Sequence, residues 1–336
     1  RKNCFGNDEM KKILITGVAG MIGSHLLDEL LKNRDYEIIG IDNFSFGNKD
    51  NITHNFGNPN FKFHPIDIFD IDSLKILTRN VDTIVHLAAV KKIDEKTPGL
   101  PTLTTNVTGT ENIYKVADMW NCKVVFASTS DVYGMSNDLP FREDGDLLLG
   151  PSMIKRWAYA VSKLYGEQLA FAYYKDKNVP VIVLRYFGGY SNRSKLLWSG
   201  GHIPIFIDAI LNDKKVPIHG DGLQTRSMAF ITDIVDGTIK AMESDRAVGE
   251  IINIGNDEEI SVLDSAKIIH KIISSGKKLD IEFIPYENVF GSYKDIQKRK
   301  PDLKKAKDIL GFTPKVSFED GVRKTLDVMK SNSLKK

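Results

Sequence analysis

Tyr159 and Lys163 stand four residues apart in the segment YAVSK, within a stretch that has the apolar spacing of a helix. Side chains at positions i and i+4 lie on one face of a helix, so the phenol and the ammonium are predicted to be neighbours. A tyrosine with its ordinary pKa of about 10 is a poor base at neutral pH, but a nearby cation favours the phenolate. Tyr159 is therefore the candidate base that takes a proton from a substrate hydroxyl while hydride leaves the same carbon.

The segment FASTSDVYG, residues 126–134, ends an apolar run that predicts a strand. Ligands of open α/β sheets bind at the carboxyl ends of the strands, so this segment is expected to face the site. Thr129 is the candidate partner that shares the reacting hydroxyl with Tyr159. Asp131 has two interpretations, either an acid or base in the site or a turn carboxylate that organises the following backbone.

Gly17, Gly20 and Gly23 form the pattern G-x-x-G-x-x-G between the first apolar run and the first helical pattern. Glycines at such a junction allow a sharp turn and let a pyrophosphate approach the backbone closely. The pyrophosphate can then bind to the N–H groups at the helix N-terminus. The spacing differs from G-x-G-x-x-G, so a plain tight turn is the competing interpretation.

Asp42 ends the second apolar run, nineteen residues after Gly23. A carboxylate at that offset accepts hydrogen bonds from the adenosine ribose hydroxyls and repels a 2′-phosphate, which favours NAD over NADP. The next residue, Asn43, supplies no cation for such a phosphate. Together with the glycines, Asp42 makes a dinucleotide site the better interpretation.

Strand-like apolar runs alternate with helical patterns along the chain and would position all of these residues. The runs are KKILITG, YEIIGID, FKFHPIDI, VDTIVHLAA, CKVVFAST and VPVIVLRYF. Parallel strands need crossover helices, so the alternation predicts an α/β fold with a Rossmann-type doubly wound parallel sheet. We expect an NAD-binding domain over residues 11–188, with returning segments near 228–256, and a smaller interleaved C-terminal substrate lobe over 189–330.

Composition excludes several classes of protein. Hydrophobic residues make up 42% of the 336 residues, and the formal net charge is +2, which indicates a folded chain without a nucleic-acid-binding charge pattern. No apolar run approaches the ~20 residues of a membrane helix. Cys4 and Cys122 are far apart, and no His or Cys stands near them at metal-ligand spacing, so no disulfide or metal is predicted. A cytoplasmic location is expected.

Together these motifs resemble the extended short-chain dehydrogenase/reductases, which are NAD-dependent nucleotide-sugar epimerases, dehydratases and decarboxylases. The resemblance runs from about Lys11 to about Lys330 and includes HLAA at 86–89. It implies NAD as the cofactor, Thr129, Tyr159 and Lys163 as the catalytic residues, and Asp131 as a candidate fourth. The NAD contacts that it implies are Gly17, Gly20, Met21, Ile22, Gly23, Asp42, Asn43, Asp67, Ile68, Leu87, Ala88, Ala89, Asn106, Tyr159 and Lys163.

The resemblance also implies a nucleotide-sugar substrate, expected to be UDP-linked, and a homodimer formed through helices near 106–118 and 158–175. Its substrate contacts map onto Thr129, Ser130, Arg226 and Arg299, with Arg226 on the diphosphate. The chain departs from the family at Gly188, where an asparagine usually touches the substrate. The segment WSGGHIP, 198–204, is expected to supply a substitute wall of the pocket.

Members of this family first oxidise C4 of the sugar to a ketone and differ in the reaction of that ketone. At the segment where this chain has Thr129-Ser130-Asp131, decarboxylases resemble T-S-E. Because the side chain of Asp131 is shorter than that of a glutamate, the first choice is a 4-epimerase acting on a UDP-hexose or UDP-hexuronate. A UDP-glucuronate decarboxylase or a nucleotide-sugar 4,6-dehydratase is the close alternative. A catalytically silent NAD-binding sensor or scaffold is the alternative of another class.

Overall fold

Seven parallel strands form the central sheet of the computed structural model, which describes residues 10–33, 35–91, 99–197, 201–274, 276–290 and 296–333. The strand order is β11-β6-β5-β4-β1-β2-β3, so the direction of winding reverses between β1 and β4. The strands are β1 (Lys11–Thr16), β2 (Tyr36–Ile41), β3 (Phe61–His64), β4 (Thr83–His86), β5 (Lys123–Thr129), β6 (Val181–Tyr186) and β11 (Glu250–Ile254). This arrangement confirms the predicted Rossmann-type fold.

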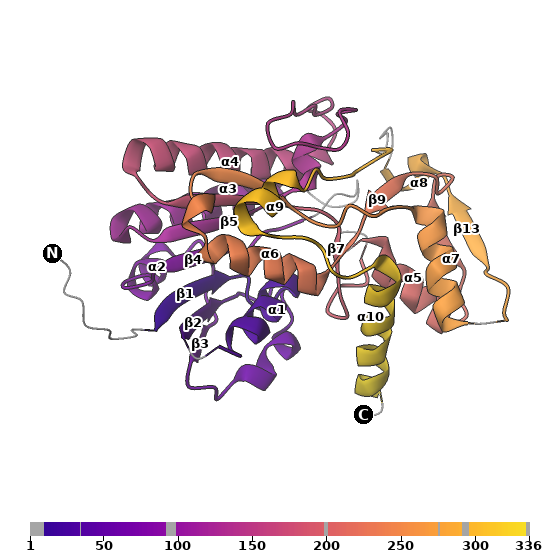
Figure 1. Cartoon of the computed structure of the whole chain (residues 1–336), viewed down its shortest axis with the longest axis horizontal. Coiled ribbons are helices and arrows are strands. Elements are labelled where there is room, and N and C mark those ends of the chain that lie inside the picture. The colour runs from indigo at the N-terminus through magenta and orange to yellow at the C-terminus, as the bar shows by residue number, and fades with distance from the viewer. Residues whose placement is uncertain are drawn as a thin grey trace.

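Helices cover both faces of this sheet (Figure 1). The helices α1 (Met21–Leu30) and α6 (Ile231–Glu243) pack together on one face, and α2 (Ile71–Leu77), α3 (Leu100–Trp120) and α4 (Trp157–Lys177) cover the other. Successive strand residues alternate between the faces: Ile13 and Ile15 belong to the first core, whereas Leu14 belongs to the second. The strands are apolar on both faces because both are buried.

The predicted strands are all present, but the third and fourth are shorter than the runs that predicted them, and β4 covers only Thr83–His86 of VDTIVHLAA. The run FKFHPIDI ends as strand β3 at His64, because Pro65 has no N–H to donate to a ladder. The amide of Ile66 instead donates to the carbonyl oxygen of His64 over 2.9 Å, in a tight turn. Asp67 therefore lies on a loop beyond the strand, at the same edge of the sheet.

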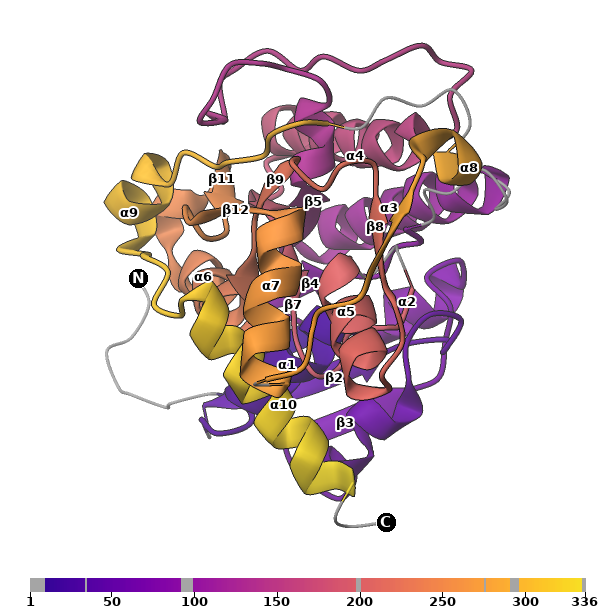
Figure 2. The ribbon, with the colours of Figure 1, turned by 90° about the vertical axis from the view of Figure 1, so that its right-hand side faces the viewer.

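The smaller lobe is built from elements that follow β6 and lies to one side of the sheet (Figures 1 and 2). Its two-stranded sheets pair β7 with β10, β8 with β13 and β9 with β12. The elements are β7 (Gly189–Tyr190), α5 (His202–Leu211), β8 (Val216–His219), β9 (Thr225–Ser227), β10 (Ala229–Phe230), β12 (Glu259–Ser261), α7 (Val262–Ile273), β13 (Ile281–Ile284), α8 (Tyr286–Phe290) and α10 (Phe318–Ser333). The helix α9 (Lys304–Leu310) instead packs against α6 and β11, beside the central sheet. The division of the chain into two domains at residue 188 stays a prediction.

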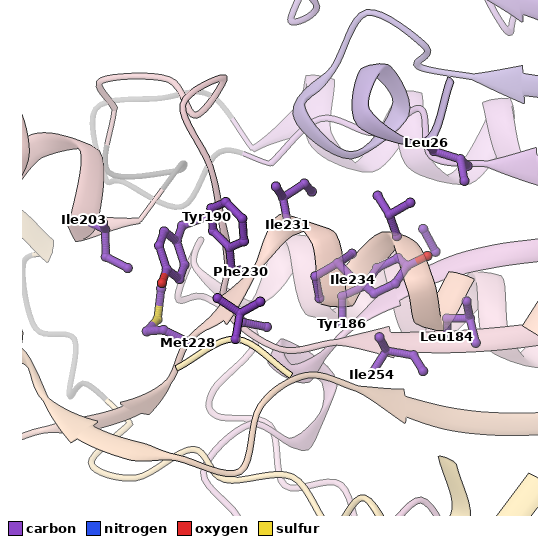
Figure 3. Packing of buried hydrophobic residues seen from close by; sticks show 14 of the residues in the cluster. Leu26, Leu184, Tyr186, Tyr190, Ile203, Met228, Phe230, Ile231, Ile234 and Ile254 are labelled. Atoms are coloured by element: carbon purple, nitrogen blue, oxygen red, sulfur yellow. The ribbon is translucent and has the colours of Figure 1, made fainter. Parts of the chain in front are cut away.

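One apolar cluster runs without a break from the central sheet into the lobe. Figure 3 shows Leu184 and Ile254 of the sheet beside Ile234 of α6, with Tyr190 and Phe230 continuing the packing toward α5. The Tyr190 hydroxyl donates to the carbonyl oxygen of Phe318 over 3.0 Å and so ties α10 to this cluster. Continuous packing of this kind fixes the lobe against the carboxyl ends of the strands.

The helices α3 and α4 pack side by side, as the resemblance requires of the two dimer helices. They expose apolar side chains, among them Leu100, Met119, Val161 and Tyr165. The homodimer through these helices stays a prediction.

Among the helices of the described residues, none has the length and apolar character needed to cross a membrane. Cys122 is buried, and Cys4 lies outside the described residues.

Candidate functional site

A cavity of about 680 Å³ opens where the sheet edge meets the lobe. It is lined by the turns after β1, β2, β4 and β5 and by residues of α4 and of the lobe. The predicted site residues that line it are Gly17, Gly20, Met21, Ile22, Gly23, Asp42, Asn43, Asp67, Ile68, Leu87, Ala88, Ala89, Thr129, Ser130, Asp131, Tyr159, Lys163, Arg226 and Arg299. The cavity therefore joins the proposed dinucleotide and sugar residues in one space.

Asn106 is the exception, because it does not line this cavity. Its side chain is buried and exchanges two hydrogen bonds with the backbone of Val90, at 2.8 and 3.0 Å. It also donates to the Ser162 hydroxyl over 2.9 Å. Asn106 thus ties the loop after β4 to α4 from behind the wall, which corrects the direct cofactor contact that the resemblance implied.

The glycine turn has no room for side chains at two of its positions. Gly17 has a φ of +70°, and a Cβ there would lie 2.8 Å from the amide nitrogen of Ala88. A Cβ on Gly23 would lie 2.3 Å from the carbonyl oxygen of Gly17. No side chain caps the N-terminus of α1, so its first N–H groups are available to an anion.

The Gly23→Ala variant is expected to lose about 1–3 kcal/mol of unfolding free energy, because the new methyl group meets backbone that cannot move aside. It should also lose NAD affinity, since relieving the clash displaces the turn. Urea denaturation and NAD titration would measure both. Gly99→Ala is the matched control, since its Cβ would meet only Ala158 Cβ at 3.9 Å. Equal stability and affinity in the two variants would contradict the assignment of this turn.

Asp42 is anchored to the same turn. Its carboxylate accepts hydrogen bonds from the amides of Ala19 at 3.0 Å and Phe44 at 2.8 Å. Burial raises the pKa of Asp42 above its ordinary value, although both amide hydrogen bonds act to lower it. Next to it, Asn43 donates to the Asp67 carboxylate over 2.5 Å, so the two predicted strand-end acids belong to one wall of the cavity.

Tyr159, Lys163 and Thr129 lie together at the other end of the cavity. Lys163 is buried and donates to the carbonyl oxygen of Ala127 over 2.8 Å. Burial lowers the pKa of Lys163 to about 7, and the charge of Glu167 opposes this shift. The pair therefore lies on one side of α4, as its spacing predicts.

The pKa of Tyr159 differs from the sequence-based expectation. Burial and the charge of Asp131 raise this pKa above its ordinary value, while hydrogen bonding with Thr129 lowers it. Lys163, which was expected to lower this pKa, is not among the groups that shift it, and its ammonium donates instead to the carbonyl oxygen of Ala127. In the protein alone, Tyr159 is therefore a protonated phenol at neutral pH.

Asp131 lies in the middle of a group of charges. Its Oδ1 atom is 2.7 Å from Arg299 Nη2 and 3.6 Å from Arg156 Nη2, and its Oδ2 atom is 3.8 Å from Lys91 Nζ. Burial alone would raise the pKa of Asp131, but the three cations outweigh it and hold the pKa well below its ordinary value. Asp131 is thus ionised, and the turn-carboxylate interpretation does not describe it. We call Asp131, Arg299, Arg156 and Lys91 the charge cluster.

Arg226 also reaches this end of the cavity, and its guanidinium donates to the carbonyl oxygens of Thr225 and Ile296 at 2.7 and 2.8 Å. Gly188 lines the cavity with a φ of +42°, and a Cβ there would lie 2.5 Å from the Ser227 carbonyl oxygen. This close approach excludes the usual asparagine. Residues 198–200 of the expected substitute wall lie outside the described residues, whereas Gly201 and His202 line the cavity.

Sequence reasoning missed two of the cluster cations. Lys91 follows the strand end HLAAV, the kind of position where open sheets place ligands, and this signal could have singled it out. Arg156 lies three residues before Tyr159, one helical turn away, but nothing in its spacing points to Asp131. A buried ion pair between Glu167 and Arg185 was missed as well, with contacts of 2.9 and 2.7 Å.

Comparisons with known proteins identify the family of the chain. A family model described as GDP-mannose 4,6 dehydratase matches residues 14–325. UDP-N-acetyl-alpha-D-glucosaminuronate decarboxylase of Bacillus cytotoxicus is 40% identical over 320 residues, which cover 94% of this chain and 97% of that protein. UDP-glucuronic acid decarboxylase 1 of Danio rerio is 34% identical, covering 95% of this chain and 72% of that protein.

A solved structure is similar over nearly the whole length. The UDP-glucuronic acid 4-epimerase of Bacillus cereus, in complex with UDP-glucuronic acid and NAD, is 33% identical with a TM-score of 0.86. The match covers 96% of this chain and 99% of that chain. With the family model and the relatives, it shows that the chain belongs to the NAD-dependent nucleotide-sugar epimerases, decarboxylases and dehydratases of the extended short-chain dehydrogenase/reductase type.

Proposed function

We propose that the chain binds NAD in the cavity, with the pyrophosphate on the N-terminus of α1 and the adenosine ribose at Asp42. The residues present fit this cofactor: the turn is closed to side chains at Gly17 and Gly23, and the helix N–H groups are available. When bound, NAD takes a hydride from C4 of the sugar and later returns it. Its positive nicotinamide ring would also favour the Tyr159 phenolate, against the burial and the Asp131 charge that disfavour it.

For the overall reaction we propose decarboxylation of a UDP-hexuronate. The observation that carries this proposal is the charge cluster, in which three cations surround one carboxylate beside Thr129 and Tyr159. The excess positive charge favours an anionic sugar over a neutral one. The relatives are named for UDP-linked hexuronates, which are anionic sugars of this kind.

The steps are those of a β-keto acid. Tyr159 takes the proton of the C4 hydroxyl as the hydride leaves C4, so that C4 becomes a ketone β to the C6 carboxylate. The bond between C5 and C6 then breaks, carbon dioxide leaves, and its electron pair forms an enolate whose oxygen faces Thr129 and Tyr159. A proton taken up at C5 turns the enolate back into a ketone. The hydride then returns to C4 while Tyr159 returns its proton to the C4 oxygen, which gives a UDP-pentose.

Asp131 favours loss of the carboxylate over its retention. An ionised carboxylate only accepts hydrogen bonds, so it cannot hold a substrate carboxylate in place by donating to it. It repels that group instead, and the repulsion is relieved when neutral carbon dioxide leaves. The short side chain was expected to keep Asp131 back from the reacting centre and so to favour epimerisation. Decarboxylation driven by repulsion uses the charge of Asp131 in the cavity and needs no proton transfer by Asp131 at close range.

A UDP-hexuronate 4-epimerase is the second candidate, supported by the Bacillus cereus neighbour and its bound UDP-glucuronic acid. An epimerase must keep the carboxylate while the keto sugar turns over, a task for hydroxyl donors rather than for an acid. A 4,6-dehydratase has less support, because elimination needs a positioned acid and base and Ser130 is neutral. A catalytically silent scaffold has the least support, because binding alone does not require the Tyr159 phenol to lie beside Thr129.

Incubation of the protein with NAD and UDP-glucuronate, followed by mass spectrometry of the nucleotide sugars, tests the proposal. We expect a product that has lost one carbon dioxide. An unchanged mass with a new sugar configuration would instead identify the epimerase, loss of water the dehydratase, and no turnover the scaffold.

The Asp131→Asn variant is expected to lower the rate of carbon dioxide release roughly 100-fold, because it removes the repulsion while keeping the side-chain volume. Asp144→Asn is the matched control: Asp144 is exposed and pairs only with the exposed Arg142 among the contacts of the described residues. Both variants should be compared with the wild-type protein at saturating UDP-glucuronate. An undiminished rate in Asp131→Asn would leave the cluster without a role in decarboxylation.

A further inference from the structure

Resting on the proposed function, we propose that Lys91 is a specificity-determining residue that binds the C6 carboxylate of the sugar and so selects UDP-hexuronates over UDP-hexoses. Lys91 is the first residue after Val90, in the loop that follows β4, and its side chain lines the cavity. It thus stands at the strand edge where this fold brings ligand-binding groups together.

The contacts of the charge cluster differ in how firmly each cation is held. Arg299 contacts Asp131 at 2.7 Å, within hydrogen-bond distance, whereas Lys91 lies 3.8 Å from the same carboxylate, beyond it. Arg156 lies at 3.6 Å and does not line the cavity. Lys91 is therefore the cation of the cluster that faces the cavity with the loosest hold on Asp131.

The exposure of these side chains agrees with this ranking. The Lys91 side chain is 41% exposed, compared with 14% for Arg299 and 8% for Arg156. An ammonium on a flexible stem can turn from Asp131 to an arriving carboxylate without breaking a buried hydrogen bond. Arg299 and Arg156 would meanwhile stay paired with the ionised Asp131, so the exchange leaves no buried charge without a partner.

Lys91 also lies close to the reacting atoms. Its Nζ atom is 5.6 Å from the centre of the Tyr159 ring, the residue proposed to receive the C4 hydroxyl proton. In a hexose ring the C6 substituent is attached at C5, next to C4. A carboxylate on C6 therefore comes within reach of the ammonium whenever C4 lies at Tyr159, whereas the neutral hydroxymethyl group of a hexose gains no ion pair there.

The test compares binding of UDP-glucuronate and UDP-glucose to Lys91→Met, with NADH in place of NAD so that no hydride leaves the sugar. Titration calorimetry should give a Kd for UDP-glucuronate that is roughly 10- to 100-fold higher than in the wild-type protein, because a charge-assisted contact is lost. The Kd for UDP-glucose should change by less than about threefold, since the nucleotide contacts are kept. Lys91→Arg should restore most of the preference for the uronate.

Lys32→Met is the matched control, because it removes the same charge from a side chain that is 70% exposed, at the end of α1. Added salt should reduce the uronate preference of the wild-type protein and of Lys32→Met, but have little effect on Lys91→Met. An unchanged ratio of the two Kd values in Lys91→Met, or an equal loss for both sugars, would overturn the assignment.

The outcomes separate this inference from the proposed reaction. If the wild-type protein releases carbon dioxide from UDP-glucuronate but Lys91→Met keeps its uronate preference, the reaction stands and the role of Lys91 is wrong. If Lys91→Met loses the preference but the wild-type protein returns UDP-glucuronate with its mass unchanged, Lys91 is the selecting cation of an enzyme that does not decarboxylate.

Discussion

The Tyr159→Phe variant is expected to lose about three orders of magnitude in kcat, the middle of the range that a general base contributes. Oxidation at C4 requires that the hydroxyl proton leave together with the hydride, and Phe offers no atom to receive it. Thr129 is not a substitute, because its hydroxyl is a far weaker base than a phenolate. Single-turnover measurement of NADH absorbance with UDP-glucuronate would detect the loss at the first step, before any decarboxylation or epimerisation.

Binding and folding should survive this change. Tyr159 is buried, and among the described contacts its hydroxyl bonds with Thr129, so Phe fills the same space with the loss of one hydrogen bond. NAD affinity should stay within about threefold of the wild-type value, since the dinucleotide turn is at the other end of the cavity. A wild-type rate in Tyr159→Phe would remove the phenol from the mechanism.

The Tyr190→Phe variant is the matched control. It also deletes a buried hydroxyl, which donates to the Phe318 carbonyl oxygen, but Tyr190 does not line the cavity. This variant should lose about 1 kcal/mol of unfolding free energy and keep its kcat. The two tyrosines thus separate an effect on chemistry from an effect on stability.

Local patterns were enough to predict the parts of the site that depend on one segment each. The spacing of Tyr159 and Lys163 placed both on one side of α4, and the glycines placed a turn closed to side chains at the start of α1. Asp42 could be assigned to the same wall because the ends of parallel strands meet at one edge. In each case the period of a helix or the topology of the sheet determines the geometry.

The charge cluster could not be predicted in the same way. It joins Lys91, Asp131, Arg156 and Arg299, which come from four separate segments, and no spacing in the sequence relates them. The direction of the pKa shift of Tyr159 could not be predicted either, because it depends on burial and on the charge of Asp131. Asn106 was predicted to be a cofactor contact because it matches a family motif. The motif gives the position of Asn106 in the sequence but not the direction of its side chain, which bonds with the backbone of Val90.

The second large effect is expected at Glu167, one helical turn after Lys163. Glu167 and Arg185 form a bidentate ion pair in which both side chains are almost fully buried, at 2% and 3% exposure. Ser128 donates to the same carboxylate over 2.5 Å. These contacts join α4 to β5 and β6 directly beneath Lys163 and Thr129.

Glu167→Gln is expected to lose about 3–5 kcal/mol of unfolding free energy, because it leaves the Arg185 guanidinium buried without its counter-charge. Glu319→Gln is the matched control, since Glu319 forms a pair with Arg323 on the exposed surface of α10. An exposed pair of this kind contributes at most about 1 kcal/mol. Urea denaturation at neutral pH would compare the unfolding free energies of the two variants. Similar losses would contradict the prediction that the buried pair stabilises the fold more than the exposed pair does.

Activity gives a readout that instability alone would not change. The charge of Glu167 raises the pKa of Lys163, which burial lowers to about 7. Without that charge the pKa of Lys163 falls further, so the ammonium that should stabilise the phenolate is lost at a lower pH. The alkaline limb of kcat in Glu167→Gln should therefore move toward acid relative to the wild-type protein.

The double variant Glu167→Leu/Arg185→Met separates charge from stability. Removing both charges leaves no guanidinium without a partner, so most of the lost unfolding free energy should return. The exceptions are the Ser128 hydrogen bond and the one from Arg185 to the Glu143 carbonyl oxygen. The pH profile should stay displaced, because Lys163 still lacks the carboxylate of Glu167. If the profile returned to that of the wild-type protein along with the stability, the ion pair would act on the fold alone, and Glu167 would not set the charge of Lys163.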